Sequence, residues 1–198
     1  MYRVNEIFYS LQGEGYNAGR AALFVRFSGC NRKCSFCDTD FSHFTEMSAD
    51  DILSRLRQEL DNAGIDIDRC EHLPMVVLTG GEPALQADRQ LVNTLHEHGF
   101  YVAMETNGSV EVADNIDWIT VSPKGETAVR VCDELKLVYT GEGTPQDNGI
   151  VATYRYLQPC DTGNEKKNRE ITEACVEYIK EHPQWMLSLQ THKLINIK

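Results

Sequence analysis

The sequence predicts an α/β protein, a partial (β/α) barrel of about six parallel strands with several helices reduced to loops, plus N- and C-terminal extensions. Three observations predict this fold. Short apolar segments of strand length alternate along the chain with helical segments or shorter connections. Most polar clusters directly follow one of these strands. The chain has 198 residues, whereas a closed eight-stranded barrel typically needs about 250.

The predicted barrel strands have the nearly continuous apolar character of strands that are covered on both faces. An extended N-terminal segment at residues 3–12 precedes them. The barrel strands are expected at residues 22–28, 75–78, 101–104, 116–121, 135–139 and 154–157, with a further strand at 186–189 near the C-terminus.

Three helices are expected between the strands. The first follows a capping box formed by Ser48 and Asp51, and its apolar residues recur at helical spacing until Asn62-Ala63-Gly64. The second is expected at residues 88–98 and the third at about 167–181. The remaining connections are short or rich in Gly, Asp and Asn, so loops are expected there in place of helices.

The composition suits a single domain, residues 1–198, because a chain of this length with 41% hydrophobic residues can bury a full core. The 19 Lys and Arg against 30 Asp and Glu give a net charge of −11, which would repel nucleic acid. No apolar run approaches the roughly 18 residues of a membrane span, and no signal-peptide core is seen. We therefore expect a cytoplasmic protein without a membrane partner.

The segment from Cys30 to Cys37 is the candidate metal site. Its thiols at Cys30, Cys34 and Cys37 are separated by three and two residues, which lets one loop wrap around an iron–sulfur cluster. Three ligands on a four-iron cluster leave one iron open to another molecule. A zinc site completed by His43 or Cys70 is the alternative, although the chain has no second C-x-x-C pair. An odd total of seven cysteines argues against a disulfide scaffold.

Polar clusters follow most of the predicted strands. Because the carboxyl ends of parallel strands share one face of a barrel, we expect the clusters to meet in one site. They are Gln12-Gly13-Glu14-Gly15, Thr79-Gly80-Gly81-Glu82-Pro83, Glu105-Thr106-Asn107-Gly108, Ser122-Pro123-Lys124, Gln158-Pro159 and Gln190-Thr191-His192-Lys193.

Two further features have a functional and a structural interpretation. Arg26 lies inside a predicted strand, where it either reaches solvent at the strand end or faces a cavity and pairs with a carboxylate. Asp38-Thr39-Asp40 offers hard oxygen ligands of the kind that Mg²⁺ prefers, or forms a solvated turn.

The cysteine loop after the first barrel strand and Gly-Gly-Glu-Pro after the second together resemble the radical S-adenosylmethionine superfamily. Within it, the polar clusters and the Cys37-Asp38-Thr39 junction are similar to those of the 7-carboxy-7-deazaguanine synthase family. That resemblance implies a carbon–nitrogen lyase of queuosine and 7-deazapurine biosynthesis. The reaction is the radical-mediated ring contraction of 6-carboxy-5,6,7,8-tetrahydropterin to 7-carboxy-7-deazaguanine with loss of ammonia.

The resemblance also implies the cofactors, the partners and the residue roles. The cofactors are a 4Fe-4S cluster, S-adenosylmethionine and Mg²⁺, and the electron donor is a protein such as a flavodoxin. The cluster is held by Cys30, Cys34 and Cys37, and Mg²⁺ by Thr39. S-adenosylmethionine is bound by Phe36, Gly81, Ser122, Pro123, Lys124 and Gln158. The substrate is bound by Gln12, Gly13, Glu14, Arg26, Thr79 and His192, with Glu105 as a catalytic residue in the same cavity.

Some expectations remain open at this point. Missing helices would leave a flank of the barrel exposed, which predicts a homodimer. Some family members place a C-terminal proline in the substrate pocket, and this sequence ends in lysine. Two competing functions are a radical activase of a glycyl-radical enzyme, which would need a surface for a protein partner, and a zinc-stabilised binding module.

Overall fold

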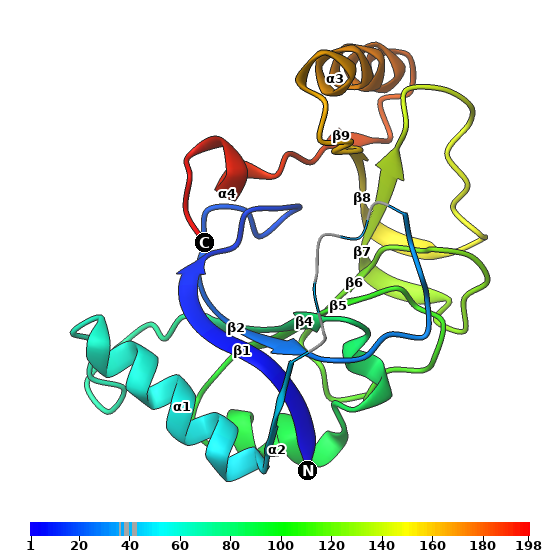
Figure 1. Ribbon diagram of the computed structural model, residues 1–198. Coiled ribbons are helices and arrows are strands. Elements are labelled where there is room, and N and C mark those ends of the chain that lie inside the picture. The colour runs from blue at the N-terminus through cyan, green and yellow to red at the C-terminus, as the bar shows by residue number, and fades with distance from the viewer. Residues whose placement is uncertain (36, 38–39, 41–42) are drawn as a thin grey trace.

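A computed structural model describes residues 1–35, 37, 40 and 43–198. Phe36 and Thr39, which the sequence assigned to cofactor and metal binding, lie outside the described residues, and so does Asp38. The strands form one curved nine-stranded sheet in the order β3-β1-β2-β4-β5-β6-β7-β8-β9 (Figure 1). Their bounds are β1 Tyr2–Leu11, β2 Ala21–Phe27, β3 Thr45–Met47, β4 Met75–Gly80, β5 Val102–Thr106, β6 Trp118–Val121, β7 Val131–Tyr139, β8 Val151–Pro159 and β9 Met186–Leu187.

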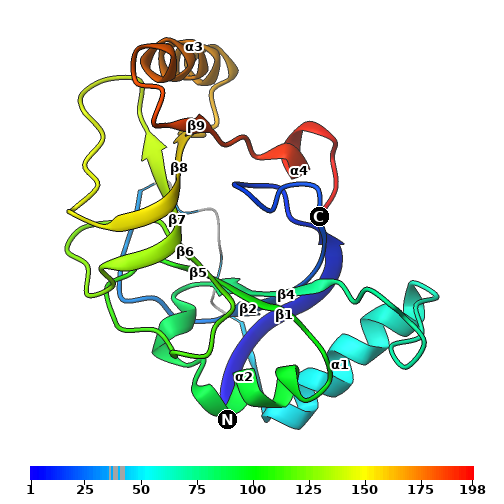
Figure 2. The ribbon, with the colours of Figure 1, turned by 180° about the vertical axis from the view of Figure 1, so that it is seen from behind.

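The sheet confirms the predicted partial barrel. Every neighbouring pair from β2 to β9 is parallel, whereas β1 is antiparallel to both β2 and β3. The six predicted barrel strands are β2 and β4 to β8, and the short β9 extends their parallel series. Figures 1 and 2 show from opposite sides that the sheet curves strongly without closing.

Three longer helices lie outside the curve of the sheet. The helix α1 (Ala49–Asn62) begins at the predicted capping box of Ser48 and Asp51, α2 is Arg89–His96, and α3 is Glu165–Glu181. The first two cover β1, β2, β4 and β5, and α3 covers β8 and β9 (Figure 1). Residues 97–164 are all described and contain no helix, which confirms the expected loops between β5 and β8.

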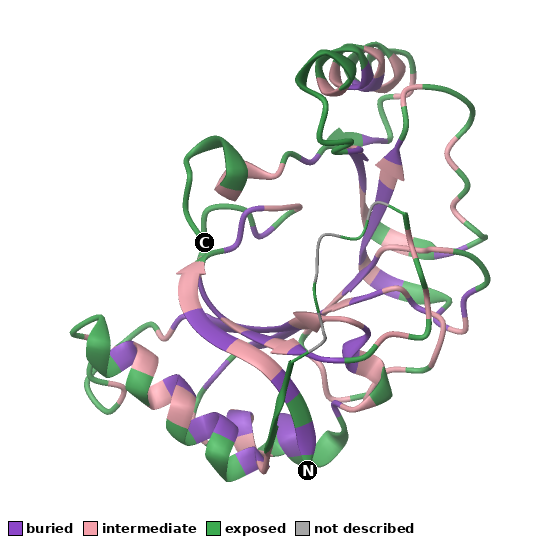
Figure 3. Ribbon diagram, in the orientation of Figure 1, coloured by how far each residue is buried: buried purple, intermediate pink, exposed green. Residues whose placement is uncertain are grey.

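The outer face of the sheet forms the main core. On β2, Leu23, Val25 and Phe27 point to this side and pack with Ile52 and Leu56 of α1. Each side chain of this kind contributes about 1.5–3 kcal/mol when it is fully buried. In Figure 3 the buried residues accordingly concentrate on the strands and on the sheet-facing sides of α1 and α2.

The inner face of the sheet changes from apolar to polar along the strands. Near the amino ends, Ala22, Met75, Val77 and Ala103 form a small buried cluster. Four residues after Ala22, the inner face of β2 carries Arg26, which lines a cavity. The fold therefore seals the lower part of the half-barrel with apolar side chains and leaves its upper part polar.

The structure departs from the predicted elements at several ends. The strands β7 and β8 begin earlier than predicted because the polar residues Glu134 and Thr153 separate their first apolar residues from the predicted segments. The last strand is only Met186–Leu187, and the following motif begins the short helix α4 (Thr191–Leu194). A single helical turn, η1 (Pro83–Leu85), follows β4. No described helix combines the length and the apolar composition needed to cross a membrane.

Candidate active site

A cavity of about 330 Å³ lies where the carboxyl ends of the parallel strands meet. Its walls bring together most of the predicted site residues, although these are spread from position 12 to position 192. They are Gln12, Gly13, Glu14, Arg26, Cys30, Cys34, Cys37, Thr79, Gly81, Glu105, Ser122, Lys124, Gln158 and His192. Pro123 is described but does not line the cavity. The predicted convergence of the strand-end clusters therefore occurs.

The three cysteines of the loop line this cavity as thiols. The loop leaves β2 at Gly29, whose φ of +95° favours glycine. The thiol sulfur of Cys30 accepts a hydrogen bond of 3.4 Å from the backbone N–H of Arg32, and the Cys37 N–H donates to the Cys34 carbonyl at 3.2 Å. The three cysteines therefore line the same cavity.

The described residues contain no group of three His, Cys, Asp or Glu side chains that could hold a single metal ion. A zinc ion needs its four ligands around one point, whereas a cluster takes its cysteines on separate irons. Neither His43 nor Cys70, the proposed fourth zinc ligands, lines the cavity. The Cys70 thiol instead donates to the His72 carbonyl. Among the described residues, neither proposed fourth ligand of a zinc ion therefore lines the cavity with the cysteines.

The loops after β2 and β4 cross at Gly81. A β-carbon on this residue would lie 2.0 Å from the carbonyl oxygen of Gly29, so no side chain fits. Backbone N–H groups of Gly81 and Glu82 donate to the carbonyls of Phe27 and Gly29, both at 2.9 Å. The sequence suggested that glycine permits a ligand to approach, and the structure adds that it permits the cysteine loop to approach.

Glu82 belongs to the loop after β4 and is fully buried where this loop meets the loop after β5. Its carboxylate accepts hydrogen bonds from Thr106 Oγ1 at 2.5 Å, from the Asn107 N–H at 2.7 Å and from the Ala84 N–H at 3.0 Å. Burial raises the pKa of this carboxyl, and the hydrogen bonds to it only partly offset the effect. Glu82 therefore fixes two loops of the cavity wall to each other.

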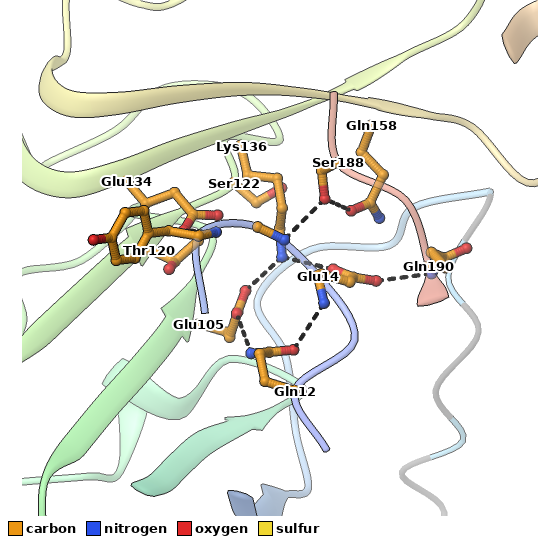
Figure 4. Close-up of polar contacts among 12 residues, drawn as sticks. Gln12, Glu14, Glu105, Thr120, Ser122, Glu134, Lys136, Gln158, Ser188 and Gln190 are labelled. Carbon is orange, nitrogen blue, oxygen red and sulfur yellow. Dashed lines mark hydrogen bonds and ion pairs between the residues drawn. The ribbon is translucent and has the colours of Figure 1, made fainter. Parts of the chain in front are cut away.

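Lys136 is the centre of a polar network in the cavity (Figure 4). Its ammonium lies 2.6 Å from Glu14 Oε2 and 2.8 Å from Glu105 Oε2. The remaining oxygens of the two carboxylates accept from Gln190 Nε2 at 2.9 Å and from Gln12 Nε2 at 3.0 Å. Burial would raise the pKa of Glu14, but the charge and hydrogen bond of Lys136 and the Gln190 amide lower it to about 2. Glu14 is therefore ionised in the cavity.

The N-terminal and C-terminal motifs of the chain form one wall. The Thr191 N–H donates to the Gly13 carbonyl at 2.9 Å, and a β-carbon on Gly13 would lie 2.3 Å from Nδ1 of His192. The Gly15 N–H donates to Ser188 Oγ at 3.0 Å. These contacts bring together two predicted substrate-binding motifs that are far apart in the sequence.

Glu134 lies beneath this wall and is 2% exposed. Its Oε2 accepts a hydrogen bond of 3.0 Å from the Tyr16 N–H, while its buried Oε1 has no hydrogen-bond partner. Burial, opposed by Lys136, raises the pKa of this carboxyl to about 7. A β-carbon on Gly15 would lie 1.9 Å from the Glu134 Oε1, so glycine is required there.

Arg26 lines the cavity and pairs with a carboxylate, which is the second of the two interpretations that the sequence left open. The carboxylate belongs to Glu6 on the adjacent β1, and its Oε1 lies 2.8 Å from Arg26 Nε. Lys198 Nζ lies 2.6 Å from the second oxygen of Glu6. Burial would raise the pKa of Glu6, but the two cations lower it. Positive charge therefore gathers at this end of the cavity.

Lys124 forms part of the opposite wall. Its ammonium donates to Ser122 Oγ at 2.6 Å and to the Ser122 carbonyl at 3.0 Å. Burial and the nearby charge of Lys136 lower the pKa of Lys124. The Ser122-Pro123-Lys124 motif thus lines the cavity with its first and third residues.

Sequence reasoning missed Lys136, Glu134 and Glu6. All three lie on strands, and Lys136 belongs to the segment 135–139 that was predicted only from its apolar pattern. A charged residue within a buried strand was the signal, as it was for Arg26. Glu6 carried a weaker signal, because an exposed residue of an alternating strand has the same appearance.

Comparison with known proteins agrees with this geometry. The profile of the Radical SAM superfamily matches residues 24–182, so the chain belongs to that superfamily. A 7-carboxy-7-deazaguanine synthase from Bacteroides thetaiotaomicron is 44% identical over 100% of both chains, and one from Nitratidesulfovibrio vulgaris is 42% identical over 99% of both. The crystal structure of QueE from Escherichia coli superposes with a TM-score of 0.68 at 26% identity and covers 96% of this chain and 94% of its own. Within the superfamily, the chain belongs to the 7-carboxy-7-deazaguanine synthase family.

Membership of this superfamily implies a 4Fe-4S cluster and S-adenosylmethionine. The residues present fit both groups. The three thiols supply the soft ligands of a cluster, and the glycines at the end of β4 keep the wall beside them free of side chains.

Proposed function

We propose that this chain is an enzyme that converts 6-carboxy-5,6,7,8-tetrahydropterin to 7-carboxy-7-deazaguanine with loss of ammonia. The observation that carries the proposal is the identity of 44% over the full length of a relative with that synthase name. The cavity supports it, because thiols, paired carboxylates and an arginine line one space of about 330 Å³. A single domain, residues 1–198, would hold the whole site in the cytoplasm.

The reaction needs a radical source and a fixed substrate. The cluster and S-adenosylmethionine would supply hydrogen-atom abstraction at C6 of the substrate, and the hydrogen atom would later be returned, because loss of ammonia leaves the oxidation level unchanged. Cys30, Cys34 and Cys37 would hold the cluster. In the adjacent wall, the backbone carbonyl of Gly81 would accept a hydrogen bond from the amino group of the methionine part. Ser122, Lys124 and Gln158 would bind the rest of S-adenosylmethionine from the ends of β6 and β8.

The chain's own charges would orient the substrate. Glu14 and Glu105 offer carboxylate oxygens that can accept from the amino and ring N–H groups of the pterin. Gln12, Gly13, Thr79 and His192 would complete this pocket. Arg26 would bind the substrate carboxylate, because a guanidinium recognises a carboxylate with two parallel hydrogen bonds. The carboxylates and the arginine would fix the two ends of the substrate, so that C6 faces S-adenosylmethionine.

The proposed Mg²⁺ would be held by Thr39 and by the substrate carboxylate. A single protein hydroxyl is a poor magnesium site, so the ion would bind well only when substrate oxygens complete its octahedron. Its role would be to orient the substrate during the ring contraction, which is a template role for a metal.

Two partner proteins complete the proposal. A small electron-transfer protein such as a flavodoxin would reduce the cluster. A second copy of the chain would cover the open flank of the barrel in a homodimer, in which exposed apolar side chains such as Val131 and Val151 could be buried. Light scattering of the purified protein tests the dimer, and a monomer at micromolar concentration would exclude it.

The proposed reaction is tested with anaerobically reconstituted protein, a chemical reductant for the cluster, S-adenosylmethionine, Mg²⁺ and substrate deuterated at C6. We expect 7-carboxy-7-deazaguanine by mass spectrometry, with deuterium recovered in S-adenosylmethionine, because loss of ammonia is redox-neutral and the abstracted hydrogen atom has to be returned. Formation of unlabelled 5′-deoxyadenosine without the deazapurine would contradict the proposal. An activase of a glycyl-radical enzyme acts on a partner protein and not on the pterin. It would therefore give no deazapurine in this assay.

A further inference from the structure

Lys136 lies on the inner face of β7, and its side chain is 6% exposed. The ammonium contacts Glu14 from the loop after β1 and Glu105 from the end of β5, at 2.6 and 2.8 Å (Figure 4). One buried cation therefore joins three separate parts of the cavity wall. Both of its partners are residues that the proposed function assigns to the substrate.

Each group that is hydrogen-bonded to the side chains of Glu14 and Glu105 is a donor. Each carboxylate gives one oxygen to Lys136, and its second oxygen accepts from the amide N–H of Gln190 or Gln12. A protonated carboxyl would turn an O–H group toward one of these donors and lose a hydrogen bond. Because an ionised carboxylate has about four lone-pair sites, two remain on each for a ligand. The donors on both sides thus suit carboxylates at Glu14 and Glu105, and each carboxylate can accept further hydrogen bonds.

The surrounding charges make Lys136 necessary for that ionisation. Glu134 faces it from β7 itself, Lys124 lies nearby in the loop after β6, and His192 approaches Glu14 from α4. Burial favours the neutral form of each carboxyl, and neighbouring carboxylates repel one another. Without the buried ammonium, protonation would be the easiest way to relieve both effects.

We propose that Lys136 is a positioning residue that determines specificity by holding Glu14 and Glu105 as anionic acceptors. This inference rests on the proposed function. The ligand class that fits is a planar heterocycle with adjacent amino and ring N–H donors, because each donor can meet a carboxylate oxygen. A heterocycle that presents carbonyl oxygens at the same edge would face two anions and be rejected.

The test compares the wild-type protein with Lys136→Met, which has a similar length and no charge. Binding of 6-carboxy-5,6,7,8-tetrahydropterin is measured anaerobically with cluster, S-adenosylmethionine and Mg²⁺ present but no reductant, so that no turnover occurs. We expect the variant to bind about tenfold more weakly at pH 6 and to approach the wild-type affinity as the pH rises to 9, since one pKa unit changes the ionised fraction about tenfold. The affinity of the wild-type protein at the same pH serves as the reference for each variant.

Leu135→Ala is the matched control. Leu135 is the adjacent residue on β7, is fully buried on the opposite face and belongs to the outer core. Its truncation weakens the strand but leaves the carboxylates untouched, so the pH dependence of binding should stay that of the wild type. Lys136→Gln provides the same comparison as Lys136→Met if the methionine variant does not fold.

Three outcomes are distinguishable. A loss of affinity that recovers at high pH only in the Lys136 variants supports the inference. An unchanged affinity, or an equal loss at every pH, would overturn it, since a purely structural role has no reason to depend on protonation. Failure of the wild-type protein to bind the tetrahydropterin at any pH would overturn the proposed function itself, and with it the inference.

Discussion

The carboxylate of Glu82 accepts a hydrogen bond of 2.7 Å from the backbone N–H of Asn107, which joins the loops after β4 and β5. The side-chain amide of Asn107 in turn lies 4.0 Å from the Cys30 sulfur and donates to Asn31 Oδ1 at 3.1 Å. A buried carboxylate outside the cavity lining therefore positions residues beside the cysteine loop. The glutamate of the Gly-Gly-Glu-Pro motif has a structural role that the motif alone did not reveal.

Replacing Glu82 by glutamine should destabilise the protein by about 1–3 kcal/mol, because the new amide N–H₂ would face the backbone and hydroxyl donors that now surround the carboxylate. Urea unfolding measures the effect. Glu97→Gln, at the exposed end of α2, is the matched control and should be nearly neutral. Equal stabilities of the two variants would contradict the structural role of Glu82.

Replacing Arg26 by lysine should weaken binding of the substrate about tenfold, because lysine keeps the charge but loses the planar fork that binds a carboxylate with two hydrogen bonds. The measurement is anaerobic binding without reductant. A tetrahydropterin analogue that lacks the 6-carboxylate is the control ligand and should bind both proteins equally. If the substitution weakened the analogue just as much, Arg26 would not recognise the carboxylate.

Glu134 should make folding stability depend on pH near neutrality. Its pKa rises from the ordinary value of 4.5 to about 7 in the folded protein. The stability that it contributes is therefore fully present below pH 4.5 and is lost as the pH rises through 7, by about 3 kcal/mol in total. Glu134→Gln has no such titration, so its unfolding free energy relative to the wild type should increase by about that amount between pH 4.5 and 8.

The control for this measurement is Glu142→Gln, whose glutamate is exposed in the loop after β7. Its stability relative to the wild type should stay constant over the same pH range. A similarly constant difference for Glu134→Gln would show that the buried carboxyl titrates normally and that its environment is more polar than the structure indicates.

The proposed magnesium site predicts that the rate of the wild-type enzyme depends on Mg²⁺ and that this dependence weakens strongly in Thr39→Ala. The reason is that the hydroxyl of Thr39 would be a direct ligand of the ion, and alanine has none. The measurement is the initial rate at increasing Mg²⁺ concentration. Unchanged magnesium dependence in the variant would remove Thr39 from the site.

The sequence predicted the architecture well because strand burial and helix capping are local signals. Runs such as Met75–Leu78 are apolar throughout, and Ser48 with Asp51 marks a helix start without tertiary information. The start of β7 was missed because Asp133 and Glu134 interrupt the apolar pattern before the predicted segment, although Glu134 is buried. The residue that obscured the strand signal, Glu134, therefore lies directly beneath the wall of the site.

The candidate site was predictable to the extent that parallel strands share one end. That topological rule placed Glu105 and Gln158 in one cavity before any contact was known, but it does not account for Gln12, because β1 is antiparallel to β2. It could not reveal that one ammonium pairs with both Glu14 and Glu105, or that Glu6 on the antiparallel β1 contacts Arg26. Such pairings depend on side-chain direction and on sheet curvature, which a linear pattern does not contain.

The most direct test of the central claim is the iron content and visible absorption spectrum of anaerobically reconstituted protein, measured beside a Cys34→Ser variant. The account predicts a brown wild-type protein with about four irons per chain and a variant that loses most of its iron. A colourless wild-type protein that holds zinc and accepts no iron would contradict the assignment of Cys30, Cys34 and Cys37, and the proposed reaction would fail with it.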